Sequence, residues 1–99
     1  MKKVLNELKI HECLQKDLHS NEYNKKNDGS NFCSKLYAAF ESSTQFNFLL
    51  EFYSGGELFF HLQDGPLKEE DAKIYFCEVL IGLDFLHQNN IIYRDLKVF

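Results

Sequence analysis

The spacing of apolar residues along this chain changes between a strand period and a helical period. In residues 34–40 the apolar and polar side chains alternate, which is typical of a half-buried strand. Residues 46–52 form a short, strongly apolar run that ends before the sequence SGG, which indicates a more deeply buried strand. The turn sequence SST lies between the two. Residues 36–52 are therefore predicted to form an antiparallel hairpin.

Two longer stretches, residues 2–19 and 68–88, have the three- and four-residue spacing of an amphipathic helix. The second has three acidic residues in its first turn, where the helix dipole favours negative charge, but no Ser, Thr or Asp at the expected N-cap. Asn89 and Asn90 are candidate C-terminal caps. The apolar stripe of this helix is predicted to be core and comprises Ala72, Tyr75, Phe76, Val79, Leu80, Leu83 and Leu86.

Three shorter segments complete the chain. Residues 57–63 suit a short helix that the sequence DGP ends. Residues 21–31 are rich in Asn, Lys, Asp, Gly and Ser and are predicted to form a flexible loop. Ile91 and Ile92 are predicted to form a brief buried strand.

The composition limits the size of the core and the kind of partner. A chain of 99 residues forms at most one small domain, at the low end of what buries a self-sufficient core. Its apolar share of 44% is globular rather than disordered, and its net charge of −4 gives no bulk attraction for nucleic acid or an anionic membrane. No stretch approaches the roughly 18 apolar residues of a membrane span. We expect a soluble, cytoplasmic protein.

The cysteines and histidines predict neither a metal site nor other chemistry. Three cysteines are an odd number, and no CxxC pair occurs, so reduced thiols in an intracellular protein are expected. His11 and Cys13 could begin a zinc site, but a second pair at ligand spacing is missing from the sequence. Cys77 is expected to be a small core residue. His61 and His87 are assigned to packing or to the surface.

The segment YRDLK, residues 93–97, places an acid between two bases. If it is extended, Asp95 and Lys97 point to one side, while Arg94 and Leu96 point to the other. A carboxylate beside an ammonium suits phosphoryl transfer, because the first can take a proton from a hydroxyl and the second can offset phosphate charge. Taken alone, such a cluster is more often a surface ion pair. The motifs that precede it decide between these interpretations.

These motifs resemble a protein kinase domain. Residues 93–97 look like the catalytic loop H-R-D-L-x-x-x-N, with Tyr93 in place of the His, and the Tyr resembles the AGC group, which includes cyclic-nucleotide-dependent kinases and protein kinase C. The sequence LEFYSGGELF at 50–59 resembles the hinge of that group, and residues 72–87 resemble its long C-lobe helix. The resemblance is continuous over about residues 32–97 and weaker in residues 4–7, which resemble the start of helix C.

The fold implied by this resemblance is α+β and covers part of a protein kinase. It has helix C, a β-hairpin and hinge from the edge of the N-lobe, and helices D and E of the C-lobe. The implied organisation is one partial domain, residues 1–99, divided into the helix C region (1–20), a loop or insertion (21–33), the hairpin and hinge (34–53), and the start of the C-lobe up to the catalytic loop (54–99).

The resemblance implies roles for four residues outside the hinge. Asp95 matches the catalytic base, and Lys97 matches the phosphate-contacting lysine associated with Ser/Thr specificity. Arg94 matches the arginine that pairs with a phosphorylated activation loop. Glu7 is the candidate for the helix C glutamate that pairs with the lysine of strand 3, although Glu12 on the same helix is an alternative and Glu7 could be an ordinary surface acid.

The resemblance also implies an ATP site at the hinge. Leu50 falls at the gatekeeper position, and the backbones of Glu51 and Tyr53 would hydrogen-bond the adenine edge. Glu57 matches the acid that touches the ribose and the basic residues of a protein substrate, which predicts basic residues near the target Ser or Thr. Its alternative interpretation is a helix N-terminal acid.

Several kinase motifs are missing from the sequence. It contains no G-x-G-x-x-G loop, no V-A-I-K lysine and no D-F-G, and it ends one position before the Asn of the catalytic loop, which is a magnesium ligand. Val98 stands where the group usually has Pro. ATP and Mg2+ are therefore implied as cofactors of the complete domain, with no metal ligands in this chain. We expect the chain alone to be marginally stable and to transfer no phosphate.

Three functional hypotheses follow. The leading one is part of an ATP-dependent protein Ser/Thr kinase, whose partners are ATP and a protein substrate rather than nucleic acid. The second is a non-catalytic, kinase-like binding module, and the third is a truncated gene remnant without a selected function.

Overall fold

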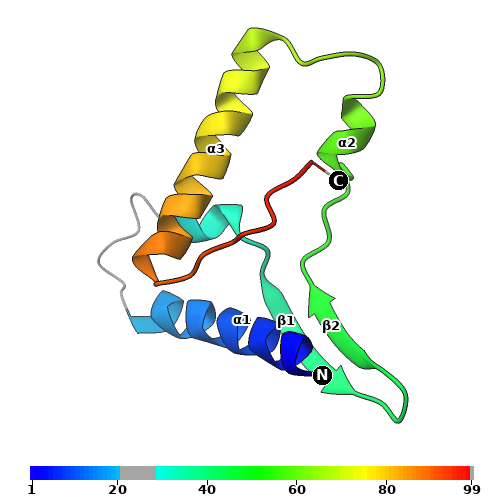
Figure 1. The fold of residues 1–99 in the computed structure, drawn as a ribbon, viewed down its shortest axis with the longest axis vertical. Coiled ribbons are helices and arrows are strands. Elements are labelled where there is room, and N and C mark those ends of the chain that lie inside the picture. Colours follow the sequence, from blue (N-terminus) through cyan, green and yellow to red (C-terminus); the bar gives the residue numbers. More distant parts are fainter. Residues whose placement is uncertain (21–28, 99) are drawn as a thin grey trace.

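The computed structural model describes residues 1–20 and 29–98, with side chains described in 1–15 and 29–98. Helices flank a two-stranded antiparallel sheet, so the predicted α+β class is confirmed (Figure 1). The elements lie close to the predicted ranges. In chain order they are α1 (Lys2–Ser20), the 3-10 helix η1 (Gly29–Phe32), β1 (Leu36–Glu41), β2 (Phe46–Leu50), α2 (Leu58–His61) and α3 (Glu69–Gln88).

The hairpin of β1 and β2 is closed by a serine turn. The hydroxyl of Ser42 accepts a hydrogen bond from the Gln45 N–H (3.1 Å), and the Ser42 N–H donates to the Gln45 carbonyl (2.8 Å). Leu36 faces Leu50, and the register shifts between Leu36 and Ala38. Such an irregularity interrupts the alternation of side chains. Leu36 is consequently the one buried residue of β1. The predicted alternation of buried and exposed residues along the strand is not observed.

Helix α3 has the two ends that the sequence predicts. Its N-cap residue, Lys68, makes no side-chain hydrogen bond to the first turn. At the other end the side-chain amide of Asn89 donates to the Phe85 carbonyl (2.8 Å), and Asn90 adopts a left-handed φ of 60°. Asn tolerates this conformation better than most residues and is a common helix terminator. The predicted C-terminal caps are confirmed.

The 3-10 helix η1 packs closely on α3. A Cβ atom on Gly29 would lie 2.5 Å from the Ile81 carbonyl oxygen and 2.6 Å from the Phe85 Cβ, so only a glycine fits without rearrangement. From the α3 side, a Cβ on Gly82 would lie 3.3 Å from the Phe32 Cβ. Glycines on both elements thus let the two backbones come together (Figure 1).

The buried apolar core of the described residues is small. It consists of Leu14 from α1, Leu36 from β1 and Leu86 from α3. The side-chain amide of Gln15 also donates to the Leu36 carbonyl, which ties α1 to the hairpin. Three elements therefore meet at the end of β1 nearest to α3.

Several sequence-based expectations are wrong. Residues 29–31 belong to η1 rather than to a loop, while residues 21–28 of the predicted loop lie outside the described part of the chain. Ile91 and Ile92 form no strand, and Ile92 is 74% exposed. Burial was also overestimated, because Cys77, the apolar run of β2 and most of the α3 stripe are exposed; Phe76 is 66% exposed.

The exposed area is large for a chain of this mass. It amounts to 8,981 Å², whereas a compact monomer of 11.7 kDa exposes about 5,900 Å². The radius of gyration, 15.6 Å, likewise exceeds the roughly 13 Å of a compact 100-residue domain. The apolar faces of α3 and of the hairpin are therefore not covered by the described residues. The marginal stability of the chain stays a prediction.

A methyl group added at Gly29 tests the contact between η1 and α3. We expect Gly29→Ala to force the two elements apart and to lower the free energy of unfolding by about 1–3 kcal/mol, which is a large loss for a chain with so small a core. Circular dichroism at 222 nm during urea denaturation would measure it.

Gly55→Ala is the matched control, because a Cβ atom there has no neighbour within 4 Å. It should leave the urea midpoint nearly unchanged. Equal midpoints for the Gly29 and Gly55 variants would contradict the role given to the close approach.

Candidate active site

The segment after α3 carries the acid and the base that the sequence singles out. Asp95 Oδ2 and Lys97 Nζ lie 3.3 Å apart, so the predicted same-side placement of these side chains is confirmed. Arg94, directly before them, has a φ of 65°. This left-handed region costs a non-glycine residue roughly 1–2 kcal/mol, and such residues tend to cluster at functional sites.

The ion pair is accessible. The side chains of Lys97 and Asp95 are 54% and 76% exposed. An exposed pair of this kind contributes at most about 1 kcal/mol to stability. It therefore does little to hold the segment in place, and both charged groups remain available to a ligand.

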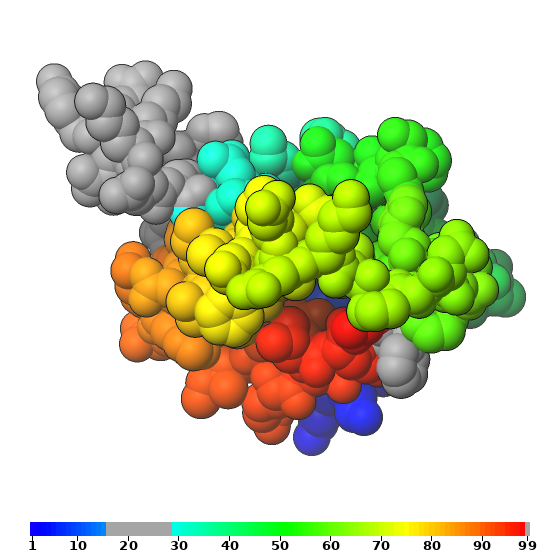
Figure 2. All heavy atoms as spheres, turned by 90° about the horizontal axis from the view of Figure 1, so that it is seen from above, coloured from blue at the N-terminus to red at the C-terminus, as the bar shows by residue number. Residues whose placement is uncertain are grey.

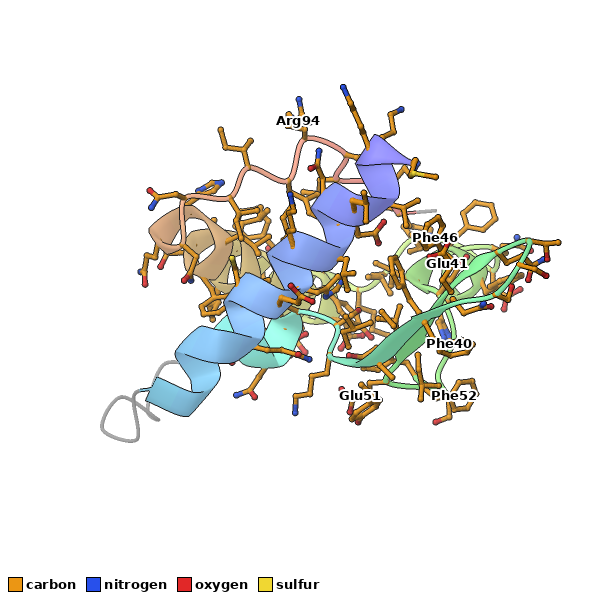
Figure 3. The ribbon with its side chains drawn as sticks, turned by 90° about the horizontal axis from the view of Figure 1, so that it is seen from below. Phe40, Glu41, Phe46, Glu51, Phe52 and Arg94 are labelled. Atoms are coloured by element: carbon orange, nitrogen blue, oxygen red, sulfur yellow. The ribbon has the colours of Figure 1, made fainter. Side chains whose placement is uncertain are left out.

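Arg94 lies apart from the hairpin end of the molecule. In Figure 3 it is at the opposite edge from Glu51 and Phe52. The segment itself starts at the C-terminal end of α3 and runs to a position beside α2, as Figures 1 and 2 both show. The fold thus brings the last described residues near α2 and leaves Arg94 on the outside.

Residues 51–56, which we name the hinge loop, connect β2 to α2. The Glu51 N–H donates to the Lys35 carbonyl (3.0 Å), which extends the hairpin by one hydrogen bond. The Tyr53 carbonyl accepts from the Gly56 N–H (3.3 Å) in a tight turn, where Gly56 has a φ of 75° that favours glycine. Leu50, the last residue of β2, is partly exposed at the entrance to this loop.

The hinge loop offers a donor and an acceptor for a ligand. Among the described residues, neither the Glu51 carbonyl nor the Tyr53 N–H has a backbone partner. Backbone polar groups need a partner, which can be protein, water or ligand. An acceptor and a donor two residues apart in an extended segment can pair with the edge of a planar base. These are the two backbones for which the resemblance to a kinase hinge predicts hydrogen bonds to adenine.

The side chains of the hinge loop form a second pair. The Tyr53 hydroxyl donates to Glu51 Oε2 (3.2 Å). Partial burial, and next to it the negative charge of Glu51, raise the pKa of the Tyr53 hydroxyl above its ordinary value. Tyr53 therefore remains a neutral donor at physiological pH, and it orients the Glu51 side chain alongside the loop.

Glu57 stands at the junction between the hinge loop and α2. It is the N-cap residue, with an extended backbone, but its carboxylate makes no capping hydrogen bond. This position agrees with the alternative interpretation of Glu57 as a helix N-terminal acid, and the exposed carboxylate is also available to a ligand. Glu7 is exposed on α1, where the structure gives it no partner within the described residues.

Sequence reasoning missed one contact of this region. The Nε2 atom of His61, in the last turn of α2, lies 2.7 Å from the Gly55 carbonyl oxygen. Its acceptor is a backbone group, which any residue at that position would supply, so the sequence carried no signal for it.

Two classes of feature do not occur in the described ranges 1–20 and 29–98. Among the described side chains, those of residues 1–15 and 29–98, no three potential His, Cys, Asp or Glu ligands gather around one point. None of the helices in those ranges is long and apolar enough to cross a membrane.

Comparison with known proteins identifies the family. Residues 1–98 match the model of the protein kinase domain, so the chain belongs to the protein kinase domain family. It is 42% identical over 67 residues to "Protein kinase C-like 1" of Candida albicans, which covers 68% of this chain and 6% of that protein. It is 48% identical over 66 residues to "Ribosomal protein S6 kinase beta" of Caenorhabditis elegans, which covers 66% of this chain and 12% of that protein.

These relatives confirm the resemblance to AGC-type Ser/Thr kinases and the partial protein-kinase fold. A further relative is the "Putative protein kinase C delta type homolog" of Drosophila melanogaster, which is 44% identical over 64 residues, 64% of this chain and 10% of that protein. The chain thus spans about a tenth or less of the length of most of these relatives. No solved structure matches it at a significant level.

Removing the charge of Glu51 tests the electrostatics of the hinge loop. We expect Glu51→Gln to lower the pKa of Tyr53, because the carboxylate that disfavours tyrosinate is gone while the burial persists. The Cζ chemical shift of Tyr53 in a pH titration by NMR would measure the change. Glu41→Gln, at the opposite end of the hairpin (Figure 3), is the control. A Tyr53 pKa that responds equally to both variants would refute the assignment.

Proposed function

We propose that this chain forms the hinge and catalytic loop of an ATP-dependent protein kinase that phosphorylates Ser or Thr residues of a protein. The observation that carries the proposal is the 3.3 Å pair of Asp95 and Lys97 in a chain of the protein kinase family. This pair places a proton acceptor beside a cation, which is what transfer of a phosphoryl group to a hydroxyl requires.

In this proposal Asp95 is the general base. Its carboxylate orients the Ser or Thr hydroxyl of the substrate and takes the proton as the oxygen attacks the γ-phosphorus. The new O–P bond forms while the bond between the γ-phosphorus and the bridging oxygen breaks, and ADP leaves. Lys97 moves from its contact with Asp95 toward the oxygens of the transferred group, where its charge stabilises the transition state. The exposure of both side chains supports this exchange, because neither is held by burial.

ATP would bind at the hinge loop. The Glu51 carbonyl and the Tyr53 N–H, which lack backbone partners in the described structure, fit the donor and acceptor of the adenine edge. Leu50 would contact the base at the end of β2. When bound with the nucleotide, Mg2+ neutralises phosphate charge. Within the described residues no set of three ligands gathers for it.

Three further residues receive roles by the same proposal. Glu57, whose carboxylate makes no capping bond, would contact the ribose and basic residues of the protein substrate. Arg94, on the outside of the catalytic segment, would pair with a phosphorylated activation loop (Figure 3). Glu7 on α1 would pair with the lysine of strand 3 of the complete domain.

The role of Asp95 is tested in a chimeric kinase domain, in which the matched segment of this chain replaces that of protein kinase C-like 1. We expect Asp95→Asn to lower kcat about a hundred- to ten-thousandfold with little change in the KM for ATP, because the amide cannot accept the proton. A peptide phosphorylation assay measures both constants.

Asp84→Asn is the matched control, since Asp84 is exposed on α3 and accepts a hydrogen bond from Gln88 (2.7 Å) in the same helix. It should retain full activity. Near-normal kcat in the Asp95 variant would refute the general-base role.

The exposed apolar area favours a second function for the 99-residue polypeptide on its own. We propose that it transfers no phosphate at a detectable rate and binds other proteins through these faces. Incubation with radiolabelled ATP and a basic peptide should give no labelled product. Turnover above the background of the Asp95→Asn polypeptide would overturn this.

A further inference from the structure

The hinge loop is held by few contacts. It contains no buried side chain, and a Cβ atom at either Gly55 or Gly56 would have no neighbour within 4 Å. Packing therefore does not fix the path of the backbone around the two glycines. Hydrogen bonds are the remaining restraint on the loop. The bond that closes the turn, from the Gly56 N–H to the Tyr53 carbonyl, is long at 3.3 Å.

The shortest hydrogen bond of the loop comes from outside it. His61 Nε2 lies 2.7 Å from the Gly55 carbonyl oxygen and joins the last turn of α2 to the loop six residues earlier. A carbonyl only accepts, so Nε2 must carry the proton. The neutral ring is thereby fixed as the Nε2–H tautomer, and the imidazolium form donates from the same atom.

We propose that His61 is a positioning residue for the nucleotide, which acts by holding the Gly55 carbonyl and hence the backbone of the hinge loop. The inference rests on the proposed binding of adenine to the Glu51 carbonyl and the Tyr53 N–H. Gly55 is two residues beyond Tyr53, and the turn between Tyr53 and Gly56 encloses it. Holding the Gly55 carbonyl therefore limits rotation within the turn of residues 53–56. Tyr53, the first residue of this turn, supplies the N–H that would bind adenine.

The same tether relates α2 to the loop. Glu57, the N-cap of α2, lies between the two ends of the His61 contact. The ring thus closes a short loop, residues 55–61, that contains the proposed ribose and substrate acid. We infer that one hydrogen bond sets both the adenine-binding backbone and the position of the Glu57 carboxylate.

The first experiment tests the tether in the full 99-residue chain. A long-range 1H–15N NMR spectrum should show His61 protonated at Nε2, and the carbonyl 13C signal of Gly55 should move in His61→Leu. His87→Leu, which removes an exposed His from the last turn of α3, is the control and should leave that signal in place. A mixture of tautomers at His61, or a Gly55 carbonyl signal that is unchanged in His61→Leu, would refute the hydrogen bond between them.

The second experiment tests positioning in the chimeric kinase domain. A single exposed hydrogen bond predicts a rise of about two- to tenfold in the KM for ATP in His61→Leu, with kcat little changed. His61→Gln should restore the KM, because its side-chain amide donates from a similar place. A circular dichroism spectrum equal to that of the parent shows that each variant is folded.

The outcomes separate this inference from the proposed function. An active chimera in which His61→Leu leaves the KM unchanged, or lowers kcat alone, overturns the positioning role and leaves the kinase assignment intact. A chimera without ATP turnover overturns the proposed function and with it the nucleotide role of His61. The NMR result on the 99-residue chain still decides whether the tether exists.

Discussion

The approach of η1 to α3 is the constraint on which the described fold most depends. Gly29 allows the first turn of η1 to lie against the Ile81 carbonyl and Phe85, at a separation where a Cβ would clash. Strand β1 begins four residues after η1, so this contact sets where the hairpin starts relative to α3. The buried residue Leu86 comes from α3, and the buried residue Leu36 begins the strand that follows η1. Few other contacts could replace it in so small a core.

The hinge loop and the catalytic segment share a different physical character. Both are exposed, irregular and fixed by hydrogen bonds or backbone conformation rather than by packing. Such segments are suited to ligands, since binding does not require the loss of core contacts. Their local features include the His61 contact and the left-handed backbone of Arg94. The site is consequently more sensitive to individual substitutions than its exposure suggests.

The sequence predicted the elements well and their burial poorly. Periodicity located α3 and the hairpin, because apolar spacing and turn residues act locally. Burial depends on neighbours, and the predicted core residue Phe76 is exposed since no described element packs on that side of α3. η1 was missed because its composition is that of a loop, and its packing depends on one glycine. In the site, the alternation of side chains in an extended segment predicted that Asp95 and Lys97 lie on the same side. The His61 contact could not be predicted, because its acceptor is a backbone carbonyl that every residue type has.

The exposed apolar faces and the accessible site have one explanation in the protein kinase family. In the proposed function, the nucleotide and the catalytic loop lie between two lobes, and the described residues would contribute to both. The exposed surfaces of the hairpin and α3 would then be faces that pack against other parts of that domain, while the loops between them carry the proposed chemistry. The excess of exposed area over that of a compact monomer would then reflect faces that the rest of the domain covers, and the exposure of Asp95 and Lys97 would allow substrate access. A partner that covered the apolar faces would be expected to leave the Asp95–Lys97 pair open.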